Sequence, residues 1–439
     1  MDAERWQTVV IGAGAAGLVA ALRAAERGKR VLLLEKNPRP GVKILMSGGT
    51  RCNLTHACDN RGIITAYGEP GKFLSSALAA FSVERTIRFF NDEGVATKVE
   101  TTGKVFPVSN RATDVLDALV RRLRRSGASL ALDEPLTEIM LPSPSFEGEG
   151  PEGRVRTPRQ PPHPNPLPRE KKAVFQLVTP RRTIDAEKVI ITSGGQSYPA
   201  AGTTGDGYRW AAAFGHVIVP PRPALTPLTV SDVWVQRLSG VTIPDVAVRV
   251  LDQTVELARR RGSFLFTHFG LSGPVVLDVS RAVSGHPRPA SLVLECDFLP
   301  AKPRAALAEE LKARTASAGR KLLLAILPEE LPGRLHEALA ANAGVRFDRK
   351  AAELTKIERL ALVAAYQQQR IAVTGTRGFR QAEVTAGGVA LGEVDSRTMQ
   401  SKLVPGLYLA GEILDLDGPI GGYNFQAAWS TGWLAGSSV

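Results

Sequence analysis

The chain has 439 residues, enough for two or three domains with buried cores. Hydrophobic residues make up 44% of it, and no run of about 18 or more apolar residues predicts a membrane-spanning helix. Acidic Asp2 and Glu4 stand where a signal peptide carries basic residues, so we expect a cytoplasmic protein. Cys52, Cys58 and Cys296 match no metal-binding or CxxC spacing, which predicts free thiols and no metal site.

The formal net charge is +12, from 55 Lys and Arg against 43 Asp and Glu. We interpret it as basic side chains spread over solvated faces, because only residues 121–125 form a dense basic cluster. Charge of this kind governs solubility and non-specific binding. Nucleic acid is therefore not the partner that we expect first, although the same charge leaves an RNA-binding or RNA-modifying protein as the alternative.

The chain opens with a strand, a glycine turn, a helix and a second strand. The apolar residues 9–11 are typical of a strand buried on both faces, and small residues after Gly17 favour a helix packed closely on it. Gly12 permits the tight turn, Gly14 lets N–H groups approach a pyrophosphate, and Gly17 lets helix and strand touch. Glu35 ends the second strand, where it can accept hydrogen bonds from a ribose and would repel a 2′-phosphate. The pattern predicts an adenine dinucleotide at the helix N-terminus.

Residues 37–55 are rich in Gly, Ser, Thr and Asn and hold the cations Lys43 and Arg51. Such a segment leaves many polar groups to satisfy, so we expect a loop against a polar, anionic ligand, with a solvent-exposed loop as the alternative. The two cations could face phosphate or a substrate carboxylate. A redox role for Cys52 stays open, although no resolving cysteine stands at CxxC spacing.

The next elements are short. We predict helices at 72–93 and 112–125, a hairpin at 95–107, and strands at 129–132, 136–141, 173–179 and 188–192. Ser82 is a possible helix N-cap, and Gly94 a natural stop. Residues 142–172 are crowded with prolines and charges, which favours a disordered insertion; a polyproline motif for a partner is the alternative.

From about residue 220 to 300 short strand-like runs alternate with turns, which predicts a separate, mostly β insert. The predicted strands are 225–230, 246–250, 263–267, 275–279 and 290–298, and residues 302–368 are predicted to be helical. The chain closes with a buried strand ending at Gly411 and Glu412, and a glycine pair, Gly421 and Gly422, that opens a helix. This second helix N-terminus is suited to an anion or a partial negative charge.

Together these motifs resemble the YhiN/HI0933-like family of bacterial flavoproteins. The resemblance is carried by residues 12–17 with Glu35, and by 43–55, 203–208, 265–274 and 398–426. Three features depart from the family pattern: Ser193 where Thr is usual before the glycine, Thr50 where a third Gly is common, and the proline-rich insertion.

The resemblance implies an α/β fold: a Rossmann-like FAD-binding domain of the two-dinucleotide-binding-domain flavoprotein type, with an inserted β-barrel-like plus helical domain. It implies a discontinuous FAD-binding domain at 1–206 and 377–439 and an inserted substrate or cap domain at 207–376. FAD would lie extended, with its isoalloxazine near 43–53 and 411–426. The residues expected to bind it are Gly12, Gly14, Ala15, Ala16, Gly17, Glu35, Lys36, Lys43, Ser47, Gly48, Gly49, Arg51, Cys52, Asn53, Gly194, Gly411, Glu412, Gly421, Gly422, Asn424 and Gln426.

Members of the family resemble oxidoreductases of diverse substrates, so we expect hydride transfer between a small organic molecule and bound FAD. We expect His268, Arg51 and Asn53 to take part in catalysis, His268 because it titrates near neutrality. A structural role for His268 between insert and core is the alternative. No second GxGxxG follows a predicted strand and opens a helix, so electrons would pass to oxygen or another acceptor, or NAD(P)H would bind transiently.

Overall fold

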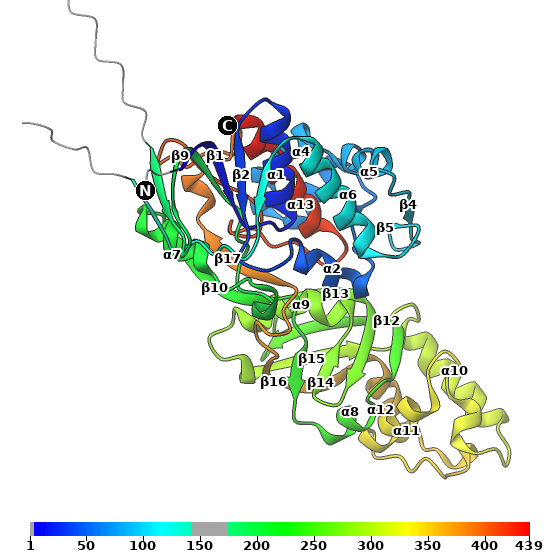
Figure 1. The fold of residues 1–439 in the computed structure, drawn as a ribbon. Coiled ribbons are helices and arrows are strands. Elements are labelled where there is room, and N and C mark those ends of the chain that lie inside the picture. The colour runs from blue at the N-terminus through cyan, green and yellow to red at the C-terminus, as the bar shows by residue number, and fades with distance from the viewer. Residues whose placement is uncertain (1–3, 142–173) are drawn as a thin grey trace, which may run out of the picture.

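The computed structural model describes residues 4–141 and 174–439. The insertion predicted at 142–172 therefore lies outside the described residues. Two large hydrophobic cores are present in the described residues, one in the nucleotide-binding part and one in the part inserted into it. A third, small cluster consists of Ala224, Leu225, Leu277, Val384 and Ala386. Figure 1 shows the two parts in contact, with the inserted part extending away from the first.

Within the described residues, a seven-stranded sheet forms the centre of the nucleotide-binding part. Its order is β6–β2–β1–β9–β8–β7, with β18 paired to β9. The strands are β1 (Glu4–Ile11), β2 (Val31–Leu34), β6 (Ser129–Ala131), β7 (Glu138–Met140), β8 (Phe175–Val178), β9 (Thr183–Ile191) and β18 (Leu407–Leu409). β1 runs parallel to β2 and β9, with Ile11 opposite Leu34 and Ile191. Because these three strands end in register, the residues that follow them meet at one edge of the sheet.

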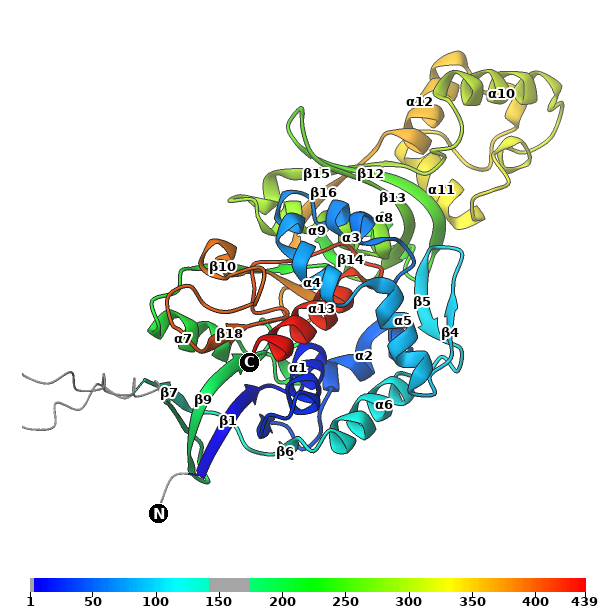
Figure 2. The ribbon, with the colours of Figure 1, turned by 90° about the horizontal axis from the view of Figure 1, so that it is seen from above.

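The first and last helices of the chain, α1 (Ala15–Glu26) and α13 (Tyr423–Ser438), lie side by side (Figure 2). Small residues let their backbones touch. A Cβ added at Gly432 would stand 2.3 Å from the carbonyl oxygen of Ala16, and one at Gly436 would stand 2.3 Å from that of Ala20. This close packing brings the N-terminal ends of both helices to the same region of the molecule.

Between β2 and β6 the chain forms short elements around these helices. They are α2 (Val42–Thr50), β3 (Thr55–His56), α3 (Asn60–Tyr67), η1 (Glu69–Leu74), α4 (Ser75–Ala80), α5 (Val83–Asp92), β4 (Thr97–Val99), β5 (Lys104–Pro107) and α6 (Ala112–Arg125). The helices predicted at 72–93 and 112–125 and the hairpin at 95–107 are confirmed. Ser82 caps α5 by accepting a hydrogen bond from the Arg85 N–H. Residues 37–55 are only partly the predicted loop, because 42–46 form regular helix before the glycines bend the backbone.

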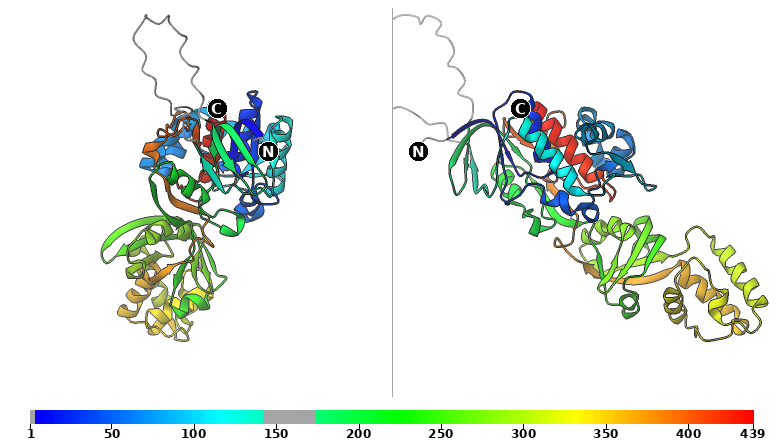
Figure 3. Two further views of the ribbon diagram at one scale, coloured as in Figure 1. Left: turned by 60° about the vertical axis from the view of Figure 1, so that its left-hand side comes forward. Right: turned by 45° about the vertical axis from the view of Figure 1, so that its right-hand side comes forward.

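The inserted part contains a closed barrel in the order β11–β14–β13–β12–β15–β16. Its strands are β11 (Leu228–Val230), β12 (Thr242–Asp252), β13 (Val255–Thr267), β14 (Gly270–Ser272), β15 (Leu292–Asp297) and β16 (Gln369–Thr376). Its helices are α8 (Val233–Arg237), α9 (Pro274–Ser284), α10 (Arg304–Ser317), α11 (Gly333–Asn342) and α12 (Lys356–Gln367), with short 3₁₀ turns η3 (Pro289–Ser291), η4 (Leu323–Ile326) and η5 (Ala351–Glu353). Figure 3 shows α10, α11 and α12, in yellow and orange, at the end of the barrel away from the sheet.

One sequence prediction about the insert is wrong. Residues 275–279, predicted as a strand, lie in helix α9, because Val275, Val276, Val279 and Val283 form one buried helical face after Pro274 at the first turn. Outside the barrel, α7 (Asp206–Ala213) packs against β10 (Ile218–Ala224) and β17 (Val384–Val389), which pair with each other.

The remaining elements are two short 3₁₀ turns, η2 (Pro199–Ala201) and η6 (Leu391–Glu393). Of the helices in the described part of the chain, none combines the length and the hydrophobicity that a bilayer crossing requires.

Candidate functional site

A cavity of about 540 Å³ lies where the ends of β1, β2 and β9 meet the N-terminal ends of α1 and α13. Its size falls within the range of about 300–1,000 Å³ found for ligand sites. Most of the residues predicted to bind the cofactor line it: Gly12, Gly14, Ala15, Ala16, Glu35, Lys36, Lys43, Ser47, Gly48, Gly49, Arg51, Asn53, Gly194, Gly411, Glu412, Gly421, Gly422 and Asn424. Gly17, Cys52, Gln426 and His268 do not.

The glycine turn before α1 has the shape that its spacing predicts. Gly12 adopts φ +97°, a conformation that favours glycine. A Cβ at Gly17 would stand 1.8 Å from the carbonyl oxygen of Gly12, so this glycine serves helix–strand contact. A Cβ at Gly14 would meet no atom within 4 Å and would project beside the cavity instead. The first turn of α1 thus offers backbone N–H groups to an anion.

Glu35 lies directly after β2, with 7% of its surface exposed. Its Oε2 accepts the Ala13 N–H at 2.8 Å, and its Oε1 accepts the N–H and side-chain amide of Asn37 at 2.9 and 2.8 Å. These bonds fix the carboxylate at the cavity wall. Oε2 accepts only one of these bonds and retains a second lone pair, so Glu35 can still accept from a ribose hydroxyl. Next to it, Lys36 is paired with Asp206 at 2.7 Å.

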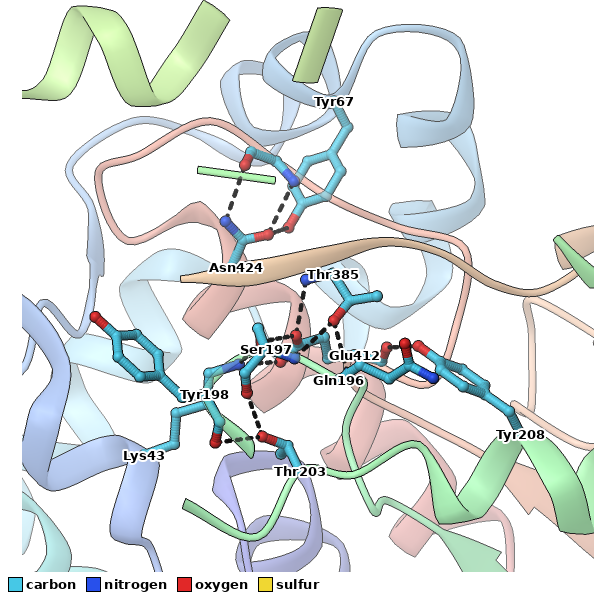
Figure 4. Close-up of polar contacts among 11 residues, drawn as sticks. Lys43, Tyr67, Gln196, Ser197, Tyr198, Thr203, Tyr208, Thr385, Glu412 and Asn424 are labelled. Carbon is cyan, nitrogen blue, oxygen red and sulfur yellow. Dashed lines mark hydrogen bonds and ion pairs between the residues drawn. The ribbon is translucent and has the colours of Figure 1, made fainter. Parts of the chain in front are cut away.

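Lys43 is committed to the protein rather than to a ligand. Its Nζ lies 2.5 Å from both Oε2 of Glu412 and Oγ of Ser197. Glu412 Oε1 also accepts from Ser197 Oγ at 2.6 Å and from the Thr385 N–H at 2.9 Å (Figure 4). This network joins α2, the loop after β9, β17 and the segment after β18. Lys43 and Glu412 therefore position the cavity wall.

The segment 47–52 has an unusual backbone. Gly48, Gly49, Thr50 and Cys52 all have φ between +56° and +67°. Glycine adopts such values freely, whereas a β-branched residue such as Thr50 is strained there. Arg51 is held over the Phe106 ring at 4.0 Å and donates to Glu100 at 2.7 Å. Both predicted glycines and Arg51 thus shape this side of the cavity.

Two buried polar atoms on the cavity wall, the side-chain oxygens of Asn53 and Ser193, have no hydrogen-bond partner among the described residues. A buried polar group without a partner costs free energy. Asn53 Oδ1 lies beside Gly422 at the cavity wall, where a polar cofactor that donates a hydrogen bond would satisfy it, whereas Ser193 Oγ lies toward Gly207 of α7. The donor set and the space at Gly14 therefore fit a dinucleotide cofactor.

At the opposite wall, the backbone before α13 is held by Asn424. Its side-chain oxygen accepts the Gly418 N–H at 2.8 Å, and its amide donates to the Gly418 carbonyl at 2.9 Å. The Tyr67 hydroxyl, which the sequence analysis did not select, donates to the Tyr423 carbonyl at 3.1 Å and lies beside Asn424 (Figure 4). Gly422 has φ +97° and begins α13, so the helix N-terminus faces the cavity.

Besides Gly17, which packs helix α1 on the sheet, three predicted residues lie outside the cavity. Cys52 is fully buried, and burial raises the pKa of its thiol to about 12, which does not suit a redox thiolate. Gln426 is buried and bonds to Thr55 at 2.7 Å inside the core. His268 is exposed on the turn between β13 and β14, where its ring contacts Phe269. His268 therefore has no contact with the cavity in this structure.

Sequence reasoning also missed Lys104 and Glu383, which line the cavity, and Asp278, which lies beside it on α9. Asp278 Oδ1 accepts the Ile420 N–H at 2.7 Å, and Arg281 of the same helix lies 3.3 Å from Asp417. The insert is thereby attached to the loop before α13. An isolated charged residue in a hairpin, before a strand or on a helix forms no motif. The sequence therefore carried no signal for Lys104, Glu383 or Asp278.

A family model described as HI0933-like protein Rossmann domain matches residues 6–148 and 163–438. The chain belongs to the HI0933-like family. The fold class and the family resemblance predicted from the motifs are thus confirmed.

Family members named for their activity match nearly the whole chain. Ribosomal RNA dihydrouridine synthase of Escherichia coli (strain K12) is 33% identical over 446 residues, covering 99% of this chain and 98% of the relative. The protein of the same name from Haemophilus influenzae is 31% identical, covering 99% and 98%. The 3-dehydro-bile acid delta(4,6)-reductase of Clostridium scindens is 32% identical, covering 98% of each. The chain is an enzyme, a flavoprotein oxidoreductase.

Proposed function

We propose that this protein is an FAD-dependent reductase whose substrate is uridine in ribosomal RNA. The observation that carries the proposal is the full-length similarity, at 33% and 31% identity, to two proteins named ribosomal RNA dihydrouridine synthase. Making dihydrouridine adds two hydrogens across a carbon–carbon double bond conjugated to a carbonyl group. The RNA-modifying alternative is thus better supported than the small-molecule substrate that we expected first.

The charge of the protein suits a polyanionic partner. The formal net charge is +12, and phosphate contacts from Lys and Arg supply most of the affinity for nucleic acid. On β13, the exposed Arg259, Arg260 and Arg261 lie in the barrel strand that packs against α9. Arg259 and Arg261 pair with acidic residues, whereas Arg260 forms no ion pair among the described residues. Arg260 is therefore available for a phosphate.

The residues of the cavity have defined tasks toward FAD. The N–H groups of the first turn of α1 would face the pyrophosphate, and Glu35 would accept from the adenosine ribose. When bound, the cofactor supplies the hydride. The N-terminus of α13 would stabilise the negative charge that builds up on the reduced ring system. The protein itself holds, orients and shields the reacting groups.

A reductase needs an electron donor, and we propose that a reduced nicotinamide, NADH or NADPH, binds transiently. Apart from residues 12–17, the GxGxxG spacing recurs only at 148–153, inside the proline-rich segment, where no strand or helix pattern flanks it. The sequence thus has no second dinucleotide fingerprint, which is consistent with a donor that binds transiently. Oxygen competes with the substrate for the electrons of the reduced cofactor. Assays without oxygen therefore separate reduction of the substrate from reduction of oxygen.

A second candidate function is favoured by the relative from Clostridium scindens. Its name describes reduction of double bonds conjugated to a keto group, which is the same bond chemistry on a steroid skeleton. The same cavity would then take a large apolar substrate instead of a nucleobase. The two candidates differ in whether RNA is bound.

One experiment tests both. The purified holoprotein is incubated without oxygen with NADH or NADPH and with unmodified, in vitro transcribed ribosomal RNA, and dihydrouridine is measured by mass spectrometry. A parallel reaction contains a steroid with a conjugated 4,6-diene-3-one. We expect dihydrouridine in the RNA reaction, with RNA binding that weakens steeply as salt rises. Reduction of the steroid with unchanged RNA would instead establish the second candidate.

A further inference from the structure

The charged side chains that line the cavity differ in whether they form hydrogen bonds or ion pairs with other protein groups. Nine are found in the described part of the chain, and seven of them hold a hydrogen bond or ion pair with protein groups. Four of the seven pair with each other across the cavity wall, Lys36 with Asp206 and Lys43 with Glu412. The other three have partners outside the lining charges: Glu35 bonds to Ala13 and Asn37, Arg51 to Glu100, and Glu134 to Arg182. The remaining two, Lys104 and Glu383, form neither among the described residues.

Glu383 is placed by the strand pair that links the two parts of the molecule. It directly precedes β17, and its N–H donates to the carbonyl of Leu225 at 3.1 Å, next to the pairing of Val384 with Ala224. Its neighbours Ala382 and Val384 are buried, while the Glu383 side chain is accessible and lines the cavity. The Glu383 side chain therefore borders the cavity and is reached from it.

The groups around Glu383 come from several elements. Lys43 of α2 and Lys104 of β5 face it with positive charge, and Asp278 of α9 and the Tyr198 hydroxyl also lie within electrostatic reach. Although the Glu383 side chain is reached from the cavity, the protein atoms around it displace part of its water and raise the pKa of Glu383 above its usual range. Asp278 adds to that effect, and the two lysines oppose it. A carboxyl group with a raised pKa keeps its proton closer to neutral pH.

We propose that Glu383 is the proton donor of the reduction. The inference rests on the proposed function, because adding two hydrogens to a conjugated double bond requires a hydride at one carbon and a proton at the other. A reduced nicotinamide supplies the electron pair through the bound cofactor. As the hydride arrives at the carbon farther from the carbonyl, the electron pair of the double bond takes the Glu383 proton at the nearer carbon. The Glu383 O–H bond breaks, a C–H bond forms, and water returns a proton to the carboxylate.

The other titratable groups near the cavity are less suited to this task. The Tyr67 hydroxyl donates to a backbone carbonyl, and burial raises the pKa of Tyr67 well above its usual value. Asp278 does not line the cavity and accepts the Ile420 N–H. Lys104 also lines the cavity, and its positive charge suits binding of a carbonyl oxygen of the substrate.

The test compares Glu383→Gln and Glu383→Asp with wild type, and uses Glu337→Gln, an exposed glutamate on α11, as the matched control. For Glu383→Gln we expect kcat to fall about 100- to 1,000-fold with KM and FAD content little changed. Wild-type kcat should fall as pH rises through the pKa of Glu383, and Glu383→Gln should lack this decline. Glu383→Asp should retain part of the activity, and Glu337→Gln all of it.

A second readout needs no substrate. The visible spectrum of bound FAD is followed from acidic to alkaline pH, and a carboxyl group in the same cavity should produce a step in wild type that Glu383→Gln lacks. Wild-type kcat and pH profile in Glu383→Gln, or a spectral step that persists in it, would overturn the assignment. If wild type leaves ribosomal RNA unchanged, the proposed substrate fails by itself, and the spectral step still decides on Glu383.

Discussion

The Nζ of Lys43 lies 2.5 Å from Oε2 of Glu412, and this ion pair joins residues that are 369 positions apart in the chain. Both side chains are about three-quarters or more buried, at 25% and 19% exposure. The pair connects α2 with the segment that leads into α13. The cofactor cavity therefore depends on a contact between the first and last parts of the fold.

We expect Lys43→Met to lower both stability and FAD affinity. Glu412 would keep its neutral donors from Ser197 and Thr385 but lose its cation, at a cost of about 1.5–3 kcal/mol in the free energy of unfolding. Chemical denaturation and FAD titration measure the two effects. A double-mutant cycle with Glu412→Gln should show a coupling energy of at least about 0.5 kcal/mol, and additive losses would contradict a direct interaction.

Alanine substitutions at Gly14 and Gly17 should have different effects, the first on FAD binding and the second on stability. Gly17→Ala places a Cβ 1.8 Å from the Gly12 carbonyl oxygen and 2.5 Å from the Thr192 hydroxyl, so we expect a loss of at least about 1–3 kcal/mol in stability. Gly14→Ala meets no protein atom within 4 Å, so the apoprotein should melt like wild type. Its methyl group should nevertheless weaken FAD binding, because it stands where the phosphates approach the N–H groups. Normal FAD binding by Gly14→Ala would rule out this placement of the pyrophosphate.

Thr50 has φ +67°, a strained value for a β-branched residue. Thr50→Gly should relieve about 1–2 kcal/mol of strain and lose about 0.5–1 kcal/mol to the greater freedom of the unfolded chain. We therefore expect a net gain of up to about 1.5 kcal/mol, measured by denaturant unfolding of the apoprotein. Thr50→Ala keeps a Cβ in the same backbone conformation and serves as the control. Equal stabilisation by both variants would show that backbone strain is not the cause.

Asp278 should make stability depend on pH. Withdrawal from water raises its pKa to about 6, although the Ile420 N–H, Arg260 and Lys104 favour the charged form. Because the folded-state pKa exceeds the unfolded one, the contribution of Asp278 to stability is lost as pH rises between about 4 and about 6.

The control for Asp278 is Asp278→Asn, which keeps an oxygen for the Ile420 N–H but does not titrate. The unfolding free energy of this variant minus that of wild type should increase by about 2–3 kcal/mol as pH rises from about 4 to about 7. Denaturant unfolding at several pH values measures the difference. A stability difference that does not change with pH would show that the carboxyl group titrates normally.

Some of the site could be predicted because short-range geometry decides it. The spacing of Gly12 and Gly17 requires a tight turn and a close helix, and the structure contains both. The glycine before α13 was predicted for the same reason. By contrast, residues 275–279 form a helix, because a run of five residues rich in Val fits a buried strand or a buried helix equally well until its neighbours are known.

The sequence by itself determined the dinucleotide fingerprint, the positions of the turns and the family, since each depends on residues that are close together in the chain. Only the tertiary structure decided that Lys43 serves Glu412 instead of a ligand and that His268 lies outside the cavity. It also decided that the side chains of Glu383 and Lys104 line the cavity with no hydrogen-bond or ion-pair partner in the described part of the chain. The physical reason is that hydrogen bonding and loss of water depend on atoms brought together by folding from distant parts of the chain.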